Sequence, residues 1–88
     1  MSYTWHLSKR AESYVGRPRR EERERIVRRL DLVAEDPYDT RVSQAASGGT
    51  GKRKTRVGSL RILFYVEDQV RIVEVTEIRP RGDVYKHL

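Results

Sequence analysis

The sequence has 88 residues, with 19 Lys or Arg against 13 Asp or Glu and a formal net charge of +6 at pH 7. This length suits a single domain, residues 1–88, with one small core. Because there is no cysteine, disulfides and thiolate metal sites are excluded. The two histidines, His6 and His87, stand at opposite ends without ligand-like spacing, so we expect no metal and no other cofactor.

The charge and hydropathy pattern indicate a location and a class of partner. The longest apolar run, residues 62–66, is too short to span a membrane, and the first residues lack the pattern of a signal peptide. We therefore expect a cytoplasmic protein that does not bind membranes. The excess of basic residues favours a polyanionic partner such as RNA, DNA, the ribosome or an acidic protein.

The first part of the chain predicts one strand and two helices. Residues 3–7 alternate as a short strand with its aromatic and leucine side chains on one face. Ser8 suits the N-cap of a helix that begins at Lys9 and ends near Gly16. Apolar residues at helical spacing predict a second helix over Arg19–Glu35, and Pro37 forces the chain out of it.

The second part predicts a loop followed by three strands. Residues 37–51 are rich in Asp, Ser, Gly and Thr and are expected to form one extended loop. From residue 52 onward the pattern has a period of two, which predicts strands over 52–57, 60–67 and 70–78. Gly58 and Ser59 fit a two-residue hairpin turn between the first two of these strands.

The register of the last strand is open between two alternatives. A two-residue turn at 68–69 would place Val73 and Val75 on the core side, whereas a three-residue turn would place Ile72 and Ile78 there and bury Glu74. We favour the first, because it avoids burying an unpaired carboxylate.

The order of these elements predicts an α+β fold. It reads strand, helix, helix and three strands, followed by a terminal segment that could form one short helix. We expect a small, mostly antiparallel sheet with a two-helix hairpin packed on one face.

The strand pattern also gathers cations on the opposite face. With the turn at Gly58-Ser59, Arg56 lies opposite Arg61, and Lys52 and Lys54 share their face. Like charges directly opposite each other destabilise a sheet, so the arrangement favours an anion-binding face over a merely solvated one. Arg53 breaks the pattern and is expected beyond the edge of the core.

Four segments, "SKRAE", "DPYD", "TRVGSLRILFYVED" and "RPRGDVY", together with the order of elements, resemble the RelE/ParE superfamily of toxins from type II toxin–antitoxin systems. The resemblance is to the RelE-like branch and covers nearly the whole chain. It implies a metal-independent endoribonuclease, an mRNA interferase that inhibits translation by cleaving messenger RNA in the ribosomal A site. It also implies a cognate antitoxin protein and contacts with the ribosome and its RNA.

The resemblance further implies the site residues. The catalytic group would be Lys52, Lys54, Arg61, Arg79 or Arg81, and Tyr85. Beside this group, the expected RNA-binding residues are Arg53, Arg56, Tyr65 and Lys86. Lys54 or Lys52 would act as the base in attack by the 2′-hydroxyl, and Arg61 would hold the developing charge. Arg79 or Arg81 would stabilise the leaving group, and Tyr85 would stack on a base.

Several alternatives stay open at this point. The lysines could be solvated strand residues, Arg61 could form an ion pair with Glu74, and Tyr85 could simply pack the tail. His87 is a weaker candidate for a general acid. The whole protein could instead be a ParE-type toxin that poisons DNA gyrase, or a non-catalytic RNA-binding relative.

Overall fold

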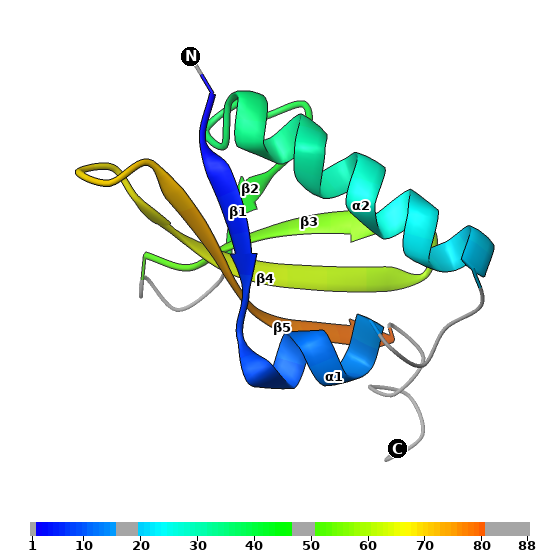
Figure 1. Ribbon diagram of the computed structural model, residues 1–88. Coiled ribbons are helices and arrows are strands. Elements are labelled where there is room, and N and C mark those ends of the chain that lie inside the picture. The colour runs from blue at the N-terminus through cyan, green and yellow to red at the C-terminus, as the bar shows by residue number, and fades with distance from the viewer. Residues whose placement is uncertain (1, 16–19, 47–50, 81–88) are drawn as a thin grey trace.

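A computed structural model describes residues 2–15, 20–46 and 51–80, in which two helices lie against a five-stranded sheet (Figure 1). The elements in chain order are β1 (Thr4–Leu7), α1 (Lys9–Val15), α2 (Arg20–Glu35), β2 (Gln44–Ala45), β3 (Arg53–Val57), β4 (Leu60–Glu67) and β5 (Ile72–Pro80). The strand order is β1-β5-β4-β3-β2, with β1 parallel to β5 and the other pairs antiparallel. The predicted α+β fold is confirmed. The short terminal helix that we expected falls outside the described residues.

Both helices contribute to a single core on one face of the sheet. The N-cap of α1 is the predicted one, because the Ala11 N–H donates to Ser8 Oγ over 3.2 Å. On α2, the predicted stripe of Ile26, Leu30 and Val33 is fully buried. The two helices occupy different parts of this face: α1 packs mainly on β5, and α2 on β3 and β1 (Figure 1). No helix in the described part of the chain is long and apolar enough to cross a membrane.

The pairing of β3 with β4 follows the prediction residue by residue. Val57 lies opposite Leu60 and Arg56 opposite Arg61, with Gly58 and Ser59 as the turn. Gly58 has a φ of 57°, which suits a glycine in the first central position of such a hairpin. The same register buries Ile62 and Phe64 against the helices.

The segment between α2 and β3 corrects one expectation. Residues 37–51 were expected to contain no strand, but Gln44 and Ala45 pair antiparallel with Lys54 and Arg53. Both strand residues are exposed, so they leave no alternation of apolar and polar residues that could reveal a strand.

The fifth strand combines features of both predicted registers. The turn before it is a four-residue loop, Asp68–Arg71, so the two-residue turn was wrong. Val73 and Val75 are buried as favoured, yet Ile78 is buried too. A bulge explains this, because Leu63 pairs with Glu77 and the next residue of β4 pairs with Val75, which leaves Thr76 as the extra residue.

The loop before β5 is tied to the start of the chain through Asp68. The hydroxyls of Tyr3 and Tyr38 each donate to one oxygen of this carboxylate, both over 2.7 Å. These two hydrogen bonds hold the pKa of Asp68 below its usual value. The hydrogen bond to Asp68, followed by burial, raises the pKa of Tyr38 to about 12.

Replacing Asp68 with Asn is expected to return the pKa of Tyr38 from about 12 toward about 10, because a neutral amide holds the phenol proton less strongly. In the native protein this tyrosine supports stability fully below about pH 10 and loses its contribution as pH rises through about 12. Asp68 contributes above about pH 3.9 and loses its contribution as pH falls through its lowered pKa. Tyrosinate absorbance in an alkaline titration measures the first effect. The control is Glu67→Gln at the exposed neighbour, and an unchanged titration of Asp68→Asn would contradict the prediction.

Candidate functional site

The sheet face opposite the helices carries a row of arginines from three adjacent strands. Arg56 on β3 pairs with Arg61 on β4, which pairs with Arg79 on β5. Neighbouring strands lie about 5 Å apart, so the backbone positions of all three fall within about 10 Å. Lys54 lies on the same face in the next row, opposite Leu63. We call Lys52, Lys54, Arg56, Arg61 and Arg79 together the basic face.

Four of these cations have no acidic partner in the part of the chain that the structure describes. Lys52, Lys54, Arg56 and Arg61 form no ion pair with a carboxylate of the residues that the structure describes. The alternative in which Arg61 pairs with Glu74 is not found, because Glu74 lies 3.1 Å from Nδ1 of His6 instead. Within the described residues, no carboxylate competes with an external anion for these side chains.

Lys52 reaches the basic face from just before β3. Its Nζ lies 5.5 Å from the centre of the Tyr65 ring, a cation–π contact. Tyr65 itself is about one-third exposed and lies on the same face as Leu63, two residues before it on β4. An exposed aromatic ring beside cations is a surface on which a nucleic-acid base can stack.

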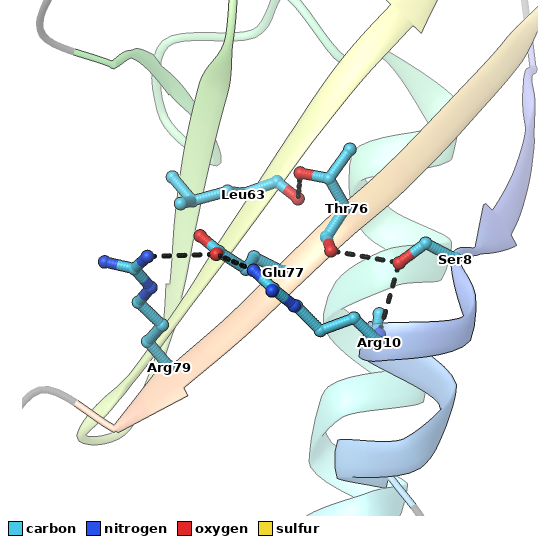
Figure 2. Close-up of polar contacts among 7 residues, drawn as sticks. Ser8, Arg10, Leu63, Thr76, Glu77 and Arg79 are labelled. Carbon is cyan, nitrogen blue, oxygen red and sulfur yellow. Dashed lines mark hydrogen bonds and ion pairs between the residues drawn. The ribbon is translucent and has the colours of Figure 1, made fainter.

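Arg79 differs from the other four because it has an acidic partner, Glu77 (Figure 2). Oε1 of Glu77 accepts from Nη2 of Arg79 over 2.9 Å and from Nη1 of Arg10 over 2.8 Å. Burial alone would raise the pKa of Glu77, but its hydrogen bonds and the charges of Arg79 and Arg10 together lower it. Glu77 is therefore ionised at neutral pH, and it neutralises Arg79.

The bulge in β5 turns Glu77 to the open face, and the path of the chain from β1 into α1 brings Arg10 to it. The strand β1 leaves the sheet after Leu7, and α1 then runs beside the second half of β5 (Figure 1). Ser8 fixes this crossing, because its Oγ donates to the backbone carbonyl of Thr76 over 2.9 Å (Figure 2). Arg10, the second residue of α1, thereby reaches Glu77 on the open face.

Arg53 does not join the basic face. Its guanidinium donates to the carbonyl of Pro37 over 3.0 Å and to Oγ of Ser43 over 2.9 Å. It also lies 5.4 Å from the centre of the Tyr38 ring. These contacts anchor the segment between α2 and β2, so the structure gives Arg53 a role in the fold. Its predicted RNA contact stays a prediction.

Several candidates fall outside the described residues, namely Arg81, Tyr85, Lys86 and His87. Two residues that the sequence reasoning did not single out do contribute to the site: Glu77 and Arg10. Their separation of 67 positions in the chain explains why no local pattern revealed their contact. Among residues 2–15, 20–46 and 51–80, no group of three or more His, Cys, Asp or Glu is placed to hold a metal ion.

Comparison with known proteins gives a result at the level of fold. No family model and no curated protein matches the sequence. Solved structures, among them the following three, are similar to this chain over nearly its whole length. A RelBE toxin–antitoxin complex from Mycobacterium tuberculosis is 18% identical with a TM-score of 0.80, covering 92% of this chain and 100% of that one. An archaeal RelE–RelB complex from Pyrococcus horikoshii OT3 is 16% identical with a TM-score of 0.78, covering 93% and 98%. The isolated RelE toxin of E. coli is 21% identical with a TM-score of 0.77, covering 98% and 94%.

The similarity expected from the sequence is therefore confirmed for the fold. The compared structures share the arrangement of helices and strands along 90% or more of each chain. At identities of 16–21% this likeness concerns the fold alone. The chemistry of the basic face has to be argued from its own residues.

Proposed function

We propose that this protein is the toxin of a type II toxin–antitoxin pair and cleaves messenger RNA, without a metal ion, in the ribosomal A site. One observation carries the proposal: Lys52, Lys54, Arg56 and Arg61 lie together on an open sheet face without a carboxylate partner among the described residues. The fold shared with RelE toxins supports it. A polyanion with phosphates along its length is the ligand that such a face suits best.

RNA brings its own nucleophile to this reaction, the 2′-hydroxyl. When this oxygen attacks the adjacent phosphorus, the bond to the 5′-oxygen of the next nucleotide breaks. The products are a 2′,3′-cyclic phosphate and a new 5′-hydroxyl end. The protein must accept the proton from the 2′-hydroxyl, hold the extra negative charge and return a proton to the leaving oxygen.

The basic face offers groups for the first two of these tasks and a cation beside the leaving oxygen, which would take its proton from water. Lys54 or Lys52 would accept the proton of the 2′-hydroxyl. Arg61 lies at the centre of the arginine row. There its planar guanidinium would donate hydrogen bonds to two phosphate oxygens as negative charge develops on them. Arg79 lies directly opposite Arg61. Once its ion pair with Glu77 is replaced by a contact with the phosphate, it would stabilise the leaving oxygen.

A second consequence of the unpaired cations concerns the antitoxin. The compared complexes are of RelE with RelB. For this chain we propose a cognate antitoxin whose acidic segment covers the basic face and neutralises it. Such a partner would suppress RNA cleavage by competing for the same cations.

The test is cleavage on translating ribosomes. Free protein is added to ribosomes that translate one defined message, and the new RNA ends are mapped and tested for a 5′-hydroxyl. The double variant Lys54→Ala/Arg61→Ala is the matched control, and supercoiled DNA with gyrase forms a parallel arm. Cuts made by the native protein and lost in the variant support the proposal. An intact message together with inhibited gyrase would replace it with a gyrase poison, and an intact message with RNA binding would replace it with a non-catalytic RNA-binding protein.

Replacing Glu77 with Gln is expected to strengthen RNA binding roughly two- to five-fold, the effect of one freed surface charge. The reason is that Arg79 no longer has to give up an ionised partner before it meets a phosphate. Fluorescence anisotropy with a single-stranded RNA at low salt measures the change. Glu74→Gln is the matched control, since it removes an acid of the same face that pairs with His6 and not with Arg79. Equal gains in both variants would show that only the net charge matters.

A further inference from the structure

The outer edge of β3 contains a hollow next to the basic face. Because β2 pairs only with Arg53 and Lys54, the rest of this edge has no strand beside it in the part of the chain that the structure describes. The hollow has a volume of about 270 Å³ and lies between α2, the segment before β2, and β3. Its cations come from all three: Arg29, Arg41, Lys54 and Arg56.

The charges in this hollow are largely uncompensated. Arg29 is half-buried on α2 and, like Lys54 and Arg56, forms no ion pair with a carboxylate in residues 2–15, 20–46 and 51–80. Only Arg41 is neutralised, by Asp39, whose carboxylate accepts from it over 2.8 and 3.1 Å. None of the described residues that line the hollow is acidic. Three cations without a carboxylate partner among the described residues surround one small space, which favours an anion as its ligand.

The hydroxyls and the lack of aromatic rings in the remaining lining favour a small anion over a nucleobase. The hydroxyls of Ser43 and Thr55 already donate to the backbone carbonyls of Pro37 and Val42. None of the described lining residues is aromatic, so they offer a base no ring on which to stack. At roughly 30 Å³ per water molecule, the volume holds a phosphate group with several waters.

The hollow is continuous with the basic face. Lys54 and Arg56 belong to both, and two residues along a strand lie about 7 Å apart. An RNA strand whose cleaved phosphate lies at Arg61 therefore passes this edge with a neighbouring phosphate. We propose that the hollow is a second phosphate subsite, which holds a phosphodiester adjacent to the cleaved one with Arg29 as its distinguishing ligand. The inference rests on the proposed function for the identity of the strand.

The experiment compares salt dependences of RNA binding. The probe is a single-stranded RNA with 2′-O-methyl groups, which the protein can bind but not cleave. The variants are Arg29→Gln, Arg29→Lys and, as a matched control on the same helix, Arg23→Gln, which is exposed and does not line the hollow. Each lost phosphate contact on a single strand reduces the slope of log K against log salt by about 0.7.

We expect Arg29→Gln to have a slope lower than that of the native protein by about 0.7. Arg29→Lys should keep most of the native slope, and Arg23→Gln should keep all of it. Thermal unfolding confirms that each variant is folded. Equal slopes in the native protein and in Arg29→Gln would overturn the proposal, and so would equal losses in both glutamine variants. If Arg29→Gln keeps the native slope for RNA but no longer binds an acidic protein partner, the hollow belongs to that partner and the proposal is overturned as well. Binding that depends on Arg29 in a protein that never cleaves RNA would overturn the proposed nuclease and leave the subsite standing.

Discussion

Replacing Arg61 with Ala is expected to reduce the rate of RNA cleavage about 100- to 1,000-fold, the effect of removing one group that stabilises the transition state. Arg61 is the middle residue of the row that joins three strands. It has no carboxylate partner among the described residues, so its removal leaves no orphaned charge and should spare the fold. Single-turnover cleavage on programmed ribosomes measures the rate, and a denaturation midpoint measures the stability.

Two further variants separate the role of charge from that of geometry. Arg61→Lys keeps the charge but loses the planar fork, so its rate should lie between those of the native protein and the alanine variant. Arg56→Ala removes the cross-strand neighbour of Arg61 and should weaken RNA binding more than it slows cleavage. A folded Arg61→Ala variant that cleaves at the native rate would mean that the basic face binds RNA but does not catalyse its cleavage.

Replacing Phe64 with Ala is expected to lower the free energy of unfolding by about 3–5 kcal/mol, as for other buried aromatic residues. Phe64 is fully buried on β4, with β3 on one side and β5 on the other. Small domains have a total stability of about 5–15 kcal/mol, so the loss would be a large part of it. Urea unfolding measures the change through the fluorescence of the single tryptophan, Trp5, whose indole donates to Asp31 on α2 over 2.8 Å.

The neighbouring residue provides the control for this prediction. Tyr65 follows Phe64 on the same strand but points to the open face, where it is about one-third exposed. Its replacement by Ala should cost less than about 1 kcal/mol, in the range of surface substitutions. Similar losses in both variants would mean that the core does not lie where the structure places it.

The pairing of β3 with β4 could be predicted because one turn fixes it. A glycine and a serine between two alternating segments leave one register, and that register separates Lys54, Arg56 and Arg61 from the core. Four of the five members of the basic face followed from this alternation. The signal is strong wherever every second residue faces a buried surface.

The last strand could not be predicted in the same way, because a bulge changes its alternation. A regular strand with Val73 and Val75 in the core would also bury Glu77. The extra residue Thr76 turns Glu77 to the open face and brings Ile78 into the core. The pairing of Arg79 with an acid therefore depends on a backbone irregularity and on a contact with Arg10, neither of which a period of two contains.

The two borders of the sheet are protected by different means, and this difference bears on how the protein behaves in solution. On one side α1 packs on β5, while on the other the part of β3 that β2 leaves unpaired carries Arg56 and lies beside Arg29 of α2. An uncovered strand invites a second molecule to continue the sheet, and mutual repulsion between cations discourages it. Concentrated salt, or the substitution Arg56→Ala, is therefore expected to promote self-association, which light scattering would detect. The charges proposed to attract a message would then also keep two copies of the protein apart.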